Sequence, residues 1–260
     1  MKDLKNIKLF LLDMDGTIYL GNQLFDGSLD FINKIRNEKK QFIFLTNNSS
    51  VSRDSYINKL NKMGISVNEE NIFTSGMALA MYLNKNYPNI PIYLSGTNSL
   101  KNELSDFGIK FTNDKPRIVV VGFDRELTYQ KLEIACKAID EGAIFLATNI
   151  DYVCPIEDGR YIPDCGSICK MITNATKKEP YFIGKPKPDM INILKDKYNL
   201  KQDEIAMIGD RIYTDIACGY NAGVVTICVL SGESTMNTIN ESSIKPDYIF
   251  NSIKDLIDLI

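Results

Sequence analysis

Histidine is absent from this chain of 260 residues. Without histidine, the chain lacks the usual general base for a serine or cysteine nucleophile and the commonest protein ligand of zinc. The six cysteines include no CxxC pair and do not form the pattern of a disulfide framework, so reduced thiols are expected. Any chemistry is therefore expected to use carboxylates, lysines and a metal ion.

Long apolar runs and clusters of basic residues are also missing. No run approaches the roughly 18 apolar residues that cross a bilayer, and the first ten residues lack the apolar segment typical of a signal peptide. The formal net charge is −3, and basic residues occur as scattered singles or short pairs. These features predict a soluble, cytoplasmic protein with neither a nucleic-acid groove nor a membrane span.

The sequence alternates short apolar runs with amphipathic stretches. The apolar runs are rich in β-branched residues and are expected to be strands, at residues 7–12, 41–45, 71–74, 90–94, 117–121, 143–147, 204–208 and 224–229. The amphipathic stretches have apolar residues three or four positions apart and are expected to be helices, at residues 29–35, 52–63, 129–139 and 188–198. Repeated strand and helix predict an α/β fold with a Rossmann-like, mostly parallel three-layer core.

Three of the expected strands are almost wholly apolar and end in polar residues. Residues 7–12, 42–45 and 205–208 are followed by DMDGT, TNNSS and GDRIYTD. Strands of this kind lie centrally in a parallel sheet, with helices on both faces. Because ligands of open α/β sheets bind beyond the carboxyl ends of the strands, the three polar tips predict one shared site.

Two carboxylates, Asp13 and Asp15, follow the first expected strand directly. Positions i and i+2 point to the same side of an extended chain, whereas Met14 points to the other side. Such a pair suits phosphoryl transfer, with Asp13 ionised beside a cation as the nucleophile and Asp15 keeping a proton for the leaving oxygen. Gly16 allows the backbone to approach a phosphate closely.

The DxDGT string at residues 13–17 resembles the first motif of the haloacid dehalogenase phosphatases, and the remaining motifs follow in order. The TNN string is similar to the second motif, in which a hydroxyl and amides hold the transferring phosphoryl oxygens. The resemblance thus implies that Thr46, Asn47 and Asn48 bind phosphate. Lys185 in GKPKP resembles the third motif, a lysine that offsets negative charge on the nucleophile and the phosphate.

The GDRIYTD segment resembles the fourth, metal-holding motif of the same family. The resemblance implies that Mg²⁺ is bound by the carboxylates of Asp13 and Asp210 and by the backbone carbonyl of Asp15, with Asp215 orienting that shell. Water would complete an octahedron of oxygen ligands. A divalent cation also suits the chemistry itself, because three acids and a dianionic phosphate repel one another in one pocket.

The order and spacing of the motifs resemble most the NagD-like or p-nitrophenylphosphatase-like group, and this resemblance covers essentially the whole chain. In that group an α/β cap is inserted between the second and third motifs. The resemblance implies a catalytic core of residues 1–80 and 181–260 and a smaller cap of residues 81–180. It also implies a small phosphorylated metabolite as substrate, such as a sugar phosphate or a nucleoside monophosphate, with p-nitrophenyl phosphate as an artificial substrate. Cap-mediated homodimers occur in that group.

A loop of the cap selects the substrate in that group, and here it is expected at residues 149–167. Asn149, Asp151 and Cys154 are its expected substrate contacts. The turn near its end reads PDCGS instead of a doubled-glycine form. Cys154 stands where some relatives use a bulkier or polar contact, so a larger pocket or weaker stacking on the leaving group is expected.

Alternative interpretations stay open for several of these residues. An Asp-x-Asp pair at a strand end is also a common turn of solvated acids, the TNN string is compatible with an Asx-type turn, and Asp215 could serve only to begin a helix. Dehalogenation and the cation-pump scheme use the same fold, but Asp15 argues against both. The main alternative is a catalytically weak sensor that binds a phosphorylated metabolite on this fold.

Overall fold

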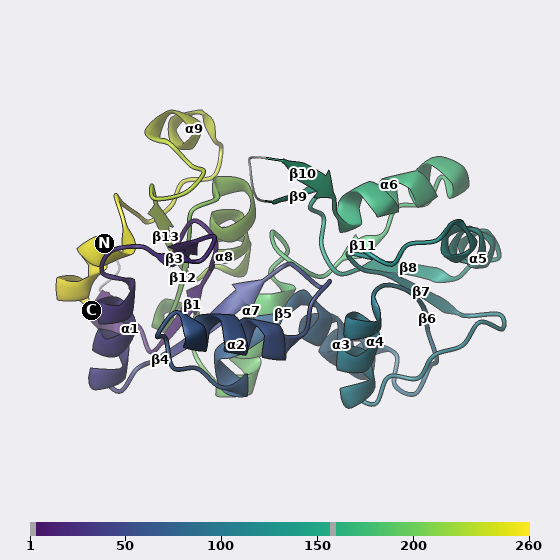
Figure 1. Ribbon diagram of the computed structural model, residues 1–260, viewed down its shortest axis with the longest axis horizontal. Coiled ribbons are helices and arrows are strands. Elements are labelled where there is room, and N and C mark those ends of the chain that lie inside the picture. Colours follow the sequence, from purple (N-terminus) through teal and green to yellow (C-terminus); the bar gives the residue numbers. More distant parts are fainter. Residues whose placement is uncertain (1–3, 157–159) are drawn as a thin grey trace. The chain divides into compact units, whose positions relative to one another are not determined.

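The computed structural model describes residues 4–156 and 160–260, which form two compact units (Figure 1). The first unit contains the chain up to Thr46, Asp54–Phe73 and Lys185–Ile260, and the second contains Asn47–Arg53 and Thr74–Gly184. The compact units differ from the expected division in that residues 47–53, 74–80 and 181–184 group with the second unit.

Within the described residues, the first unit contains a six-stranded sheet in the order β14-β13-β12-β1-β4-β5. The strands are β1 Leu9–Leu12, β4 Gln41–Thr46, β5 Ile72–Thr74, β12 Ile205–Gly209, β13 Val225–Val229 and β14 Tyr248–Phe250. β1 pairs in parallel with both β4 and β12, and every residue of β1 and β12 is buried. Central, fully buried parallel strands confirm the α/β core expected from the apolar runs.

Each described α-helix of this unit buries apolar side chains. They are α1 Ser28–Asn37, α2 Arg53–Lys62, α7 Asp189–Tyr198, α8 Ala217–Ala222 and α9 Met236–Glu241. α1 buries Phe31, Ile32 and Ile35 at helical spacing and packs against β4, whereas α8 packs against β12 and β13. A short hairpin, β2 Tyr19–Leu20 and β3 Gln23–Leu24, follows β1.

The second unit has a sheet of its own, which in the described part of the chain is four-stranded and parallel in the order β11-β8-β7-β6. Its strands are β6 Tyr93–Ser95, β7 Ile118–Val121, β8 Ile144–Ala147 and β11 Tyr181–Phe182. Its helices are α3 Ser75–Asn86, α4 Asn98–Asp106, α5 Tyr129–Asp140 and α6 Cys165–Thr176. An antiparallel hairpin, β9 Val153–Pro155 and β10 Tyr161–Pro163, comes between β8 and α6.

A polar side chain caps the start of each of these four helices. Thr74, Thr97 and Thr128 each accept a hydrogen bond from the backbone N–H three residues on, at the starts of α3, α4 and α5. Asp164 accepts from the N–H of Cys165 at the start of α6. Each cap satisfies a backbone donor that the helix itself leaves without a partner, which fixes where these helices begin.

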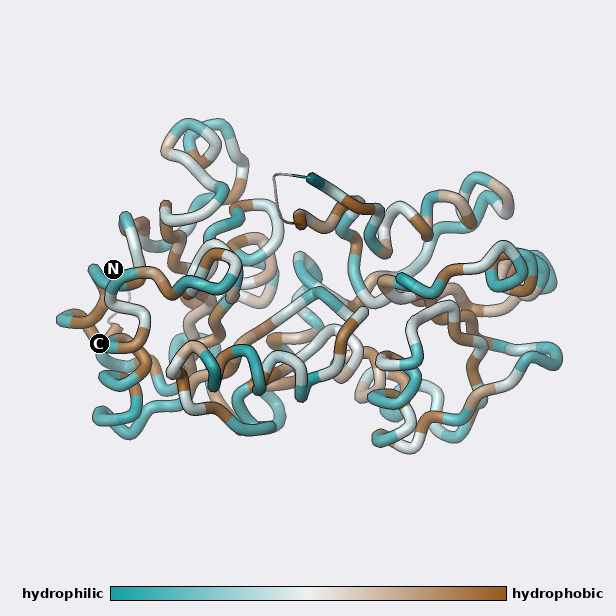
Figure 2. Tube along the Cα trace, in the orientation of Figure 1, coloured by the Kyte–Doolittle hydropathy of each residue, from teal (hydrophilic) through white to brown (hydrophobic). Residues whose placement is uncertain are grey.

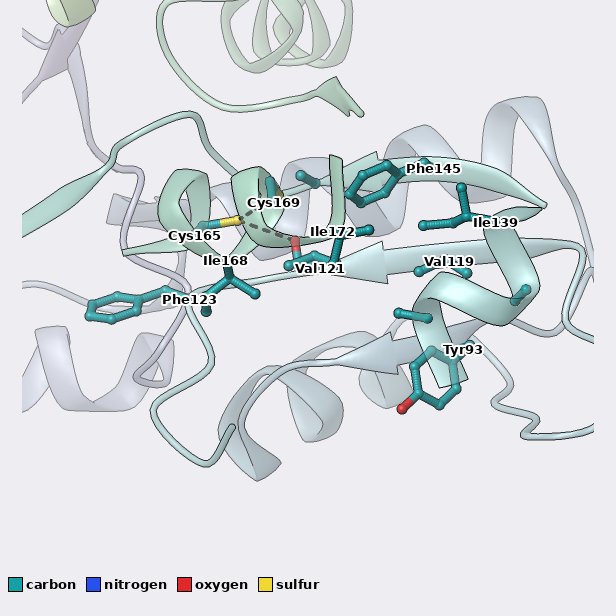
Figure 3. Packing of buried hydrophobic residues seen from close by; sticks show 13 residues of the cluster. Tyr93, Val119, Val121, Phe123, Ile139, Phe145, Cys165, Ile168, Cys169 and Ile172 are labelled. Atoms are coloured by element: carbon teal, nitrogen blue, oxygen red, sulfur yellow. Dashed lines mark hydrogen bonds between the residues drawn. The ribbon is translucent and has the colours of Figure 1, made fainter. Parts of the chain in front are cut away.

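Both units bury apolar residues along their strands, where the trace in Figure 2 is mostly hydrophobic. In the second unit, Val119 and Val121 of β7 and Phe145 of β8 pack with α5 and α6 in one cluster (Figure 3). The Sγ atoms of Cys165 and Cys169 lie 3.9 Å apart within this core. None of the helices within residues 4–156 and 160–260 combines the length and apolar character that crossing a bilayer requires.

Candidate active site

Three expected site residues stand at the carboxyl ends of neighbouring strands in the first unit. Asp13 follows β1, Thr46 is the last residue of β4, and Asp210 follows β12. β1 lies between β4 and β12 in the sheet, so the three polar tips occupy one edge. This is the position where open α/β sheets bind their ligands.

Three carboxylates converge at this edge. Asp13, Asp210 and Asp215 each offer one oxygen atom, and these three atoms all lie within 4.8 Å of one another. Burial, together with the negative charge of Asp215, raises the pKa of Asp13 well above its usual range and raises the pKa of Asp210 to about 6. The ionised forms of these acids thus repel one another, and carboxylate oxygen atoms are the ligands that a hard divalent cation prefers. The donor set fits a metal ion.

Lys185 lies inside this cluster and is only 3% exposed. Its Nζ donates to Asp13 Oδ1 at 2.6 Å and to Asp215 Oδ1 at 2.5 Å, and it lies 3.5 Å from the carbonyl oxygen of Leu45. Burial opposes the charged form of Lys185, but the two adjacent carboxylates outweigh that effect and raise its pKa. Lys185 is therefore a fixed positive charge between Asp13 and Asp215. The peptide bond that links it to Pro186 is cis.

The carboxylate of Asp210 is held in place from several sides. The backbone N–H of Glu233 donates to its Oδ2 at 2.8 Å, and the Thr17 hydroxyl lies 3.5 Å from its Oδ1. Gly16 has a φ of 85°, and a Cβ at that position would come within 2.4 Å of Asp210 Oδ2. Only glycine therefore fits between the first strand and this carboxylate.

A loop after β13, residues 231–234, supports the site although no motif in the sequence marked it. The Ser231 hydroxyl donates to the carbonyl oxygen of Gly16 at 2.8 Å, and the N–H of Ser234 donates to that of Asp210 at 3.1 Å. The loop thus connects the turn after β1 with the turn after β12. A short polar stretch containing glycine was its only signal in the sequence.

The side chain of Asp15 is exposed, but the protein atoms around its carboxyl group displace part of the surrounding water, and this desolvation raises its pKa. The positive charge of Lys59 and the hydroxyl of Tyr19 act in the opposite direction. The Lys59 ammonium also lies 4.0 Å from the centroid of the Tyr19 ring. A carboxyl group with a raised pKa in this position holds its proton more readily, as a general acid requires.

Arg211 is a further charged residue at this site that the motifs did not single out. Its Nε lies 3.0 Å from Glu233 Oε2, and the Tyr213 hydroxyl donates to Oε1 of the same glutamate at 2.6 Å. Burial works against the charge of Arg211, but Asp13, Asp215 and Asp210 prevail and raise its pKa. Its place inside the GDRIYTD string was the signal that could have identified it.

The residues of the TNN string divide between the two units. Thr46 belongs to the first, and its hydroxyl lies 3.4 Å from that of Tyr56. Asn47 and Asn48 belong to the second. Asn48 Oδ1 accepts from both the N–H and the hydroxyl of Ser50, at 2.9 and 2.8 Å, so an Asx-type turn is present at this asparagine.

The expected substrate contacts of the loop at residues 149–167 lie in the second unit. Asn149 is fully buried, and its Nδ2 donates to Asp151 Oδ2 at 2.9 Å. Cys154 lies in β9 and packs against the hydrophobic cluster of that unit. Residues 157–159 of the expected loop fall outside the described part of the chain.

Family comparisons agree with this arrangement. Residues 10–110 match the family model of haloacid dehalogenase-like hydrolases, and residues 182–256 match the model of HAD-hydrolase-like proteins. An acid sugar phosphatase of Staphylococcus epidermidis is 37% identical over 251 residues, which cover 96% of both proteins. This chain belongs to the haloacid dehalogenase-like hydrolases.

Solved structures place it more narrowly among the haloacid dehalogenase-like hydrolases. A 4-nitrophenylphosphatase from Thermotoga maritima superimposes with a TM-score of 0.93 at 39% identity, covering 98% of both chains. NagD from E. coli K-12 superimposes with a TM-score of 0.89 at 30% identity, covering 96% of this chain and 98% of that one. These similarities confirm the expected NagD-like, p-nitrophenylphosphatase-like group.

Proposed function

We propose that this phosphomonoesterase of the haloacid dehalogenase-like family hydrolyses small phosphomonoesters, such as sugar phosphates, through an aspartyl phosphate on Asp13. The observation that carries the proposal is the placement of Lys185 between Asp13 and Asp215, beside Asp210, at the carboxyl end of β1. The similarity to acid sugar phosphatases over nearly the whole chain supports the substrate class. The similarity to a 4-nitrophenylphosphatase supports p-nitrophenyl phosphate as an artificial substrate.

In the first step, an oxygen of Asp13 attacks the phosphorus in line with the leaving oxygen. The bond between phosphorus and the leaving oxygen breaks, and Asp15 donates its proton to the departing alkoxide. The raised pKa of Asp15 favours the protonated form that this step needs. Lys185 offsets the negative charge that gathers on Asp13 and on the phosphoryl oxygens.

In the second step, water attacks the phosphorus of the aspartyl phosphate, and the bond between phosphorus and Asp13 breaks. Asp15, now ionised, accepts the proton of the attacking water, which restores both carboxyl groups to their starting states. Thr46, at the end of β4, together with Asn47 and Asn48, is proposed to bind the transferring phosphoryl oxygens, with Gly16 allowing a close approach.

Asp13, Asp210 and the backbone carbonyl of Asp15 would hold the Mg²⁺ ion, and Asp215 would orient its surroundings. When bound, the ion supplies positive charge that offsets the repulsion between the phosphate and the carboxylates. The convergence of three carboxylate oxygens within 4.8 Å supports this assignment.

The second unit is proposed to act as the cap that selects the substrate. Its core and sheet are its own, and the hairpin of β9 and β10 lies in the expected selection loop. Cys154 is the candidate contact there, whereas the buried Asn149 bonds to Asp151 within the unit. Replacement of Cys154 by histidine should change the order of preference among phosphate esters. A homodimer that uses this cap stays a prediction.

The decisive experiment is a phosphate-release screen over sugar phosphates, nucleoside monophosphates and p-nitrophenyl phosphate, with and without Mg²⁺. Metal-dependent turnover that Asp13→Asn abolishes, in a folded protein, supports the proposal. Wild-type turnover in Asp13→Asn would contradict the nucleophile. Tight binding of phosphorylated metabolites without turnover would favour the sensor, and release of halide would favour dehalogenation.

A further inference from the structure

Asn47 lies where the chain passes from the first unit to the second, directly after Thr46. The chain also passes between the units after Phe73 and after Gly184, and residues next to both of these points contact Asn47. The hydroxyl of Ser75, which follows the passage at Phe73, donates to the backbone oxygen of Asn47 at 2.7 Å. Gly184, the residue before Lys185, packs so closely that a Cβ there would come within 2.6 Å of Asn47 Oδ1. Asn47 is thus a junction adjacent in the chain to Thr46 and in contact with the neighbour of Lys185.

The side chain of this junction residue is held by the loop after β8. Asn47 Nδ2 donates to Asp151 Oδ2 at 2.7 Å, although 104 positions separate the two residues. Asn149 Nδ2 donates to the same oxygen at 2.9 Å and to Asp164 Oδ1 at 3.1 Å. One oxygen of Asp151 thus receives two amide hydrogen bonds. Hydrogen bonds to a carboxylate are about twice as strong as neutral ones.

A chain of hydroxyl groups fixes the direction of the Asn149 amide. The Thr148 hydroxyl donates to Asn149 Oδ1 at 2.9 Å and lies 3.0 Å from the Ser49 hydroxyl oxygen. That oxygen in turn accepts from the backbone N–H of Phe123 at 3.0 Å. Because Asn149 Oδ1 is used as an acceptor, its NH₂ group must face the carboxylates of Asp151 and Asp164. Asp151 is therefore part of a fully oriented network inside the second unit.

We infer that Asp151 is a positioning residue for phosphoryl transfer and not a contact that selects the leaving group. Its carboxylate fixes Asn47, and Asn47 in turn fixes the chain at Thr46 and at Gly184, one bond from Lys185. This inference rests on the proposed function. It predicts that Asp151 affects the step shared by all substrates, because the phosphoryl group is the part of the molecule that they have in common.

The first test compares kcat and KM across several phosphate esters for Asp151→Ala. Loss of the two hydrogen bonds should lower kcat by about tenfold to a hundredfold. A small misplacement of the phosphate-binding groups lowers reaction rates by factors of this size. The factor should be the same for p-nitrophenyl phosphate and for each sugar phosphate, with KM little changed. Asp151→Asn should restore most of the activity, because its Oδ1 accepts both amide hydrogens. Asp140→Ala, an exposed acid in the same unit, is the matched control.

The second test is a double-mutant cycle with Asn47. If Asp151 acts through Asn47, then Asp151→Ala should lower kcat less than twofold further in an Asn47→Ala background. Additive losses, a loss confined to some substrates, or failure of Asp151→Asn to restore activity would each overturn the inference. If Asp151→Ala does not fold, as judged by thermal unfolding, Asp151→Ser supplies the same comparison. Failure of the proposed function is a separate outcome, because the wild-type protein itself would then release no phosphate.

Discussion

The ammonium group of Lys185 lies 2.6 Å from Oδ1 of Asp13, although 172 positions separate the two residues in the chain. The same ammonium group lies 2.5 Å from Oδ1 of Asp215, so one positive charge serves a partly buried carboxylate and a fully buried one. With Asp210 beside them, the negative charges outnumber this lysine. A phosphate would add further negative charge, so we expect turnover to need both Lys185 and a cation.

Replacement of Lys185 by methionine should impair both activity and stability. The variant leaves Asp13 and the fully buried Asp215 without their shared partner, and removing one member of a buried ion pair costs about 3 kcal/mol or more. We expect kcat for p-nitrophenyl phosphate to fall by about a thousandfold, because an aligned charge at the phosphoryl group is lost. Steady-state kinetics and urea unfolding measure the two effects.

Lys187→Met is the matched control for this variant. Lys187 lies in the same GKPKP string but is exposed. Its replacement should leave kcat within about twofold and stability within about 0.5 kcal/mol, as for other surface substitutions. Equal losses in the two variants would show that the string as a whole matters and that the Lys185 charge has no special role.

Mg²⁺ should stabilise the folded protein in the absence of any substrate. A ligand that binds only the folded state at about a hundred times its dissociation constant adds about 2.7 kcal/mol, which raises the thermal midpoint by several degrees. Asp210→Asn should abolish this shift because a proposed ligand is lost. The exposed acid Asp203 offers the control, since Asp203→Asn should keep the full shift. The same shift in wild type and Asp210→Asn would argue against a metal site at Asp210.

The central strands and their polar ends could be predicted from the sequence because the signal is local. A strand buried on both faces appears in the sequence as an unbroken apolar run, and the residues expected to form a strand at 204–208 are found in β12, Ile205–Gly209.

Helix α3 was not predicted from the sequence. Its residues are apolar around much of the helix, with Gly76, Ala78 and Ala80 all buried, so the contrast between two faces is weak.

The supporting contacts of the site could not be predicted in the same way. The N–H of Glu233 reaches Asp210, and Asp151 reaches Asn47, only because packing brings distant loops together. A polar loop has no periodic pattern that would reveal which strand end it covers. The motifs therefore predicted candidate reacting groups, but they did not mark the distant residues that hydrogen-bond to them.

Lys59 should set the upper pH limit of activity through Asp15. Its positive charge lowers the pKa of Asp15, against the larger effect of desolvation by the surrounding protein, which raises that pKa. Lys59→Met removes the charge that favours ionised Asp15, so the pKa of Asp15 should rise and the alkaline limb of kcat/KM should move to higher pH. Lys62→Met, an exposed change on the same helix, should leave the limb in place. A shift toward lower pH would exclude Asp15 as the acid.

Glu103 should make the stability of the second unit depend on pH. Burial raises its pKa from 4.5 to about 7, while a hydrogen bond from Thr74 opposes this shift. The folded state therefore holds the proton more tightly than the unfolded state, so the stabilising effect is complete below pH 4.5 and is lost as pH rises through 7. Glu103→Gln should remove this loss. In urea unfolding, its free energy of unfolding should be about 3 kcal/mol higher than that of the wild type at pH 8 and nearly the same at pH 4.5. The exposed Glu133→Gln should track the wild type at both pH values, and a Glu103→Gln curve parallel to the wild type would refute the shift.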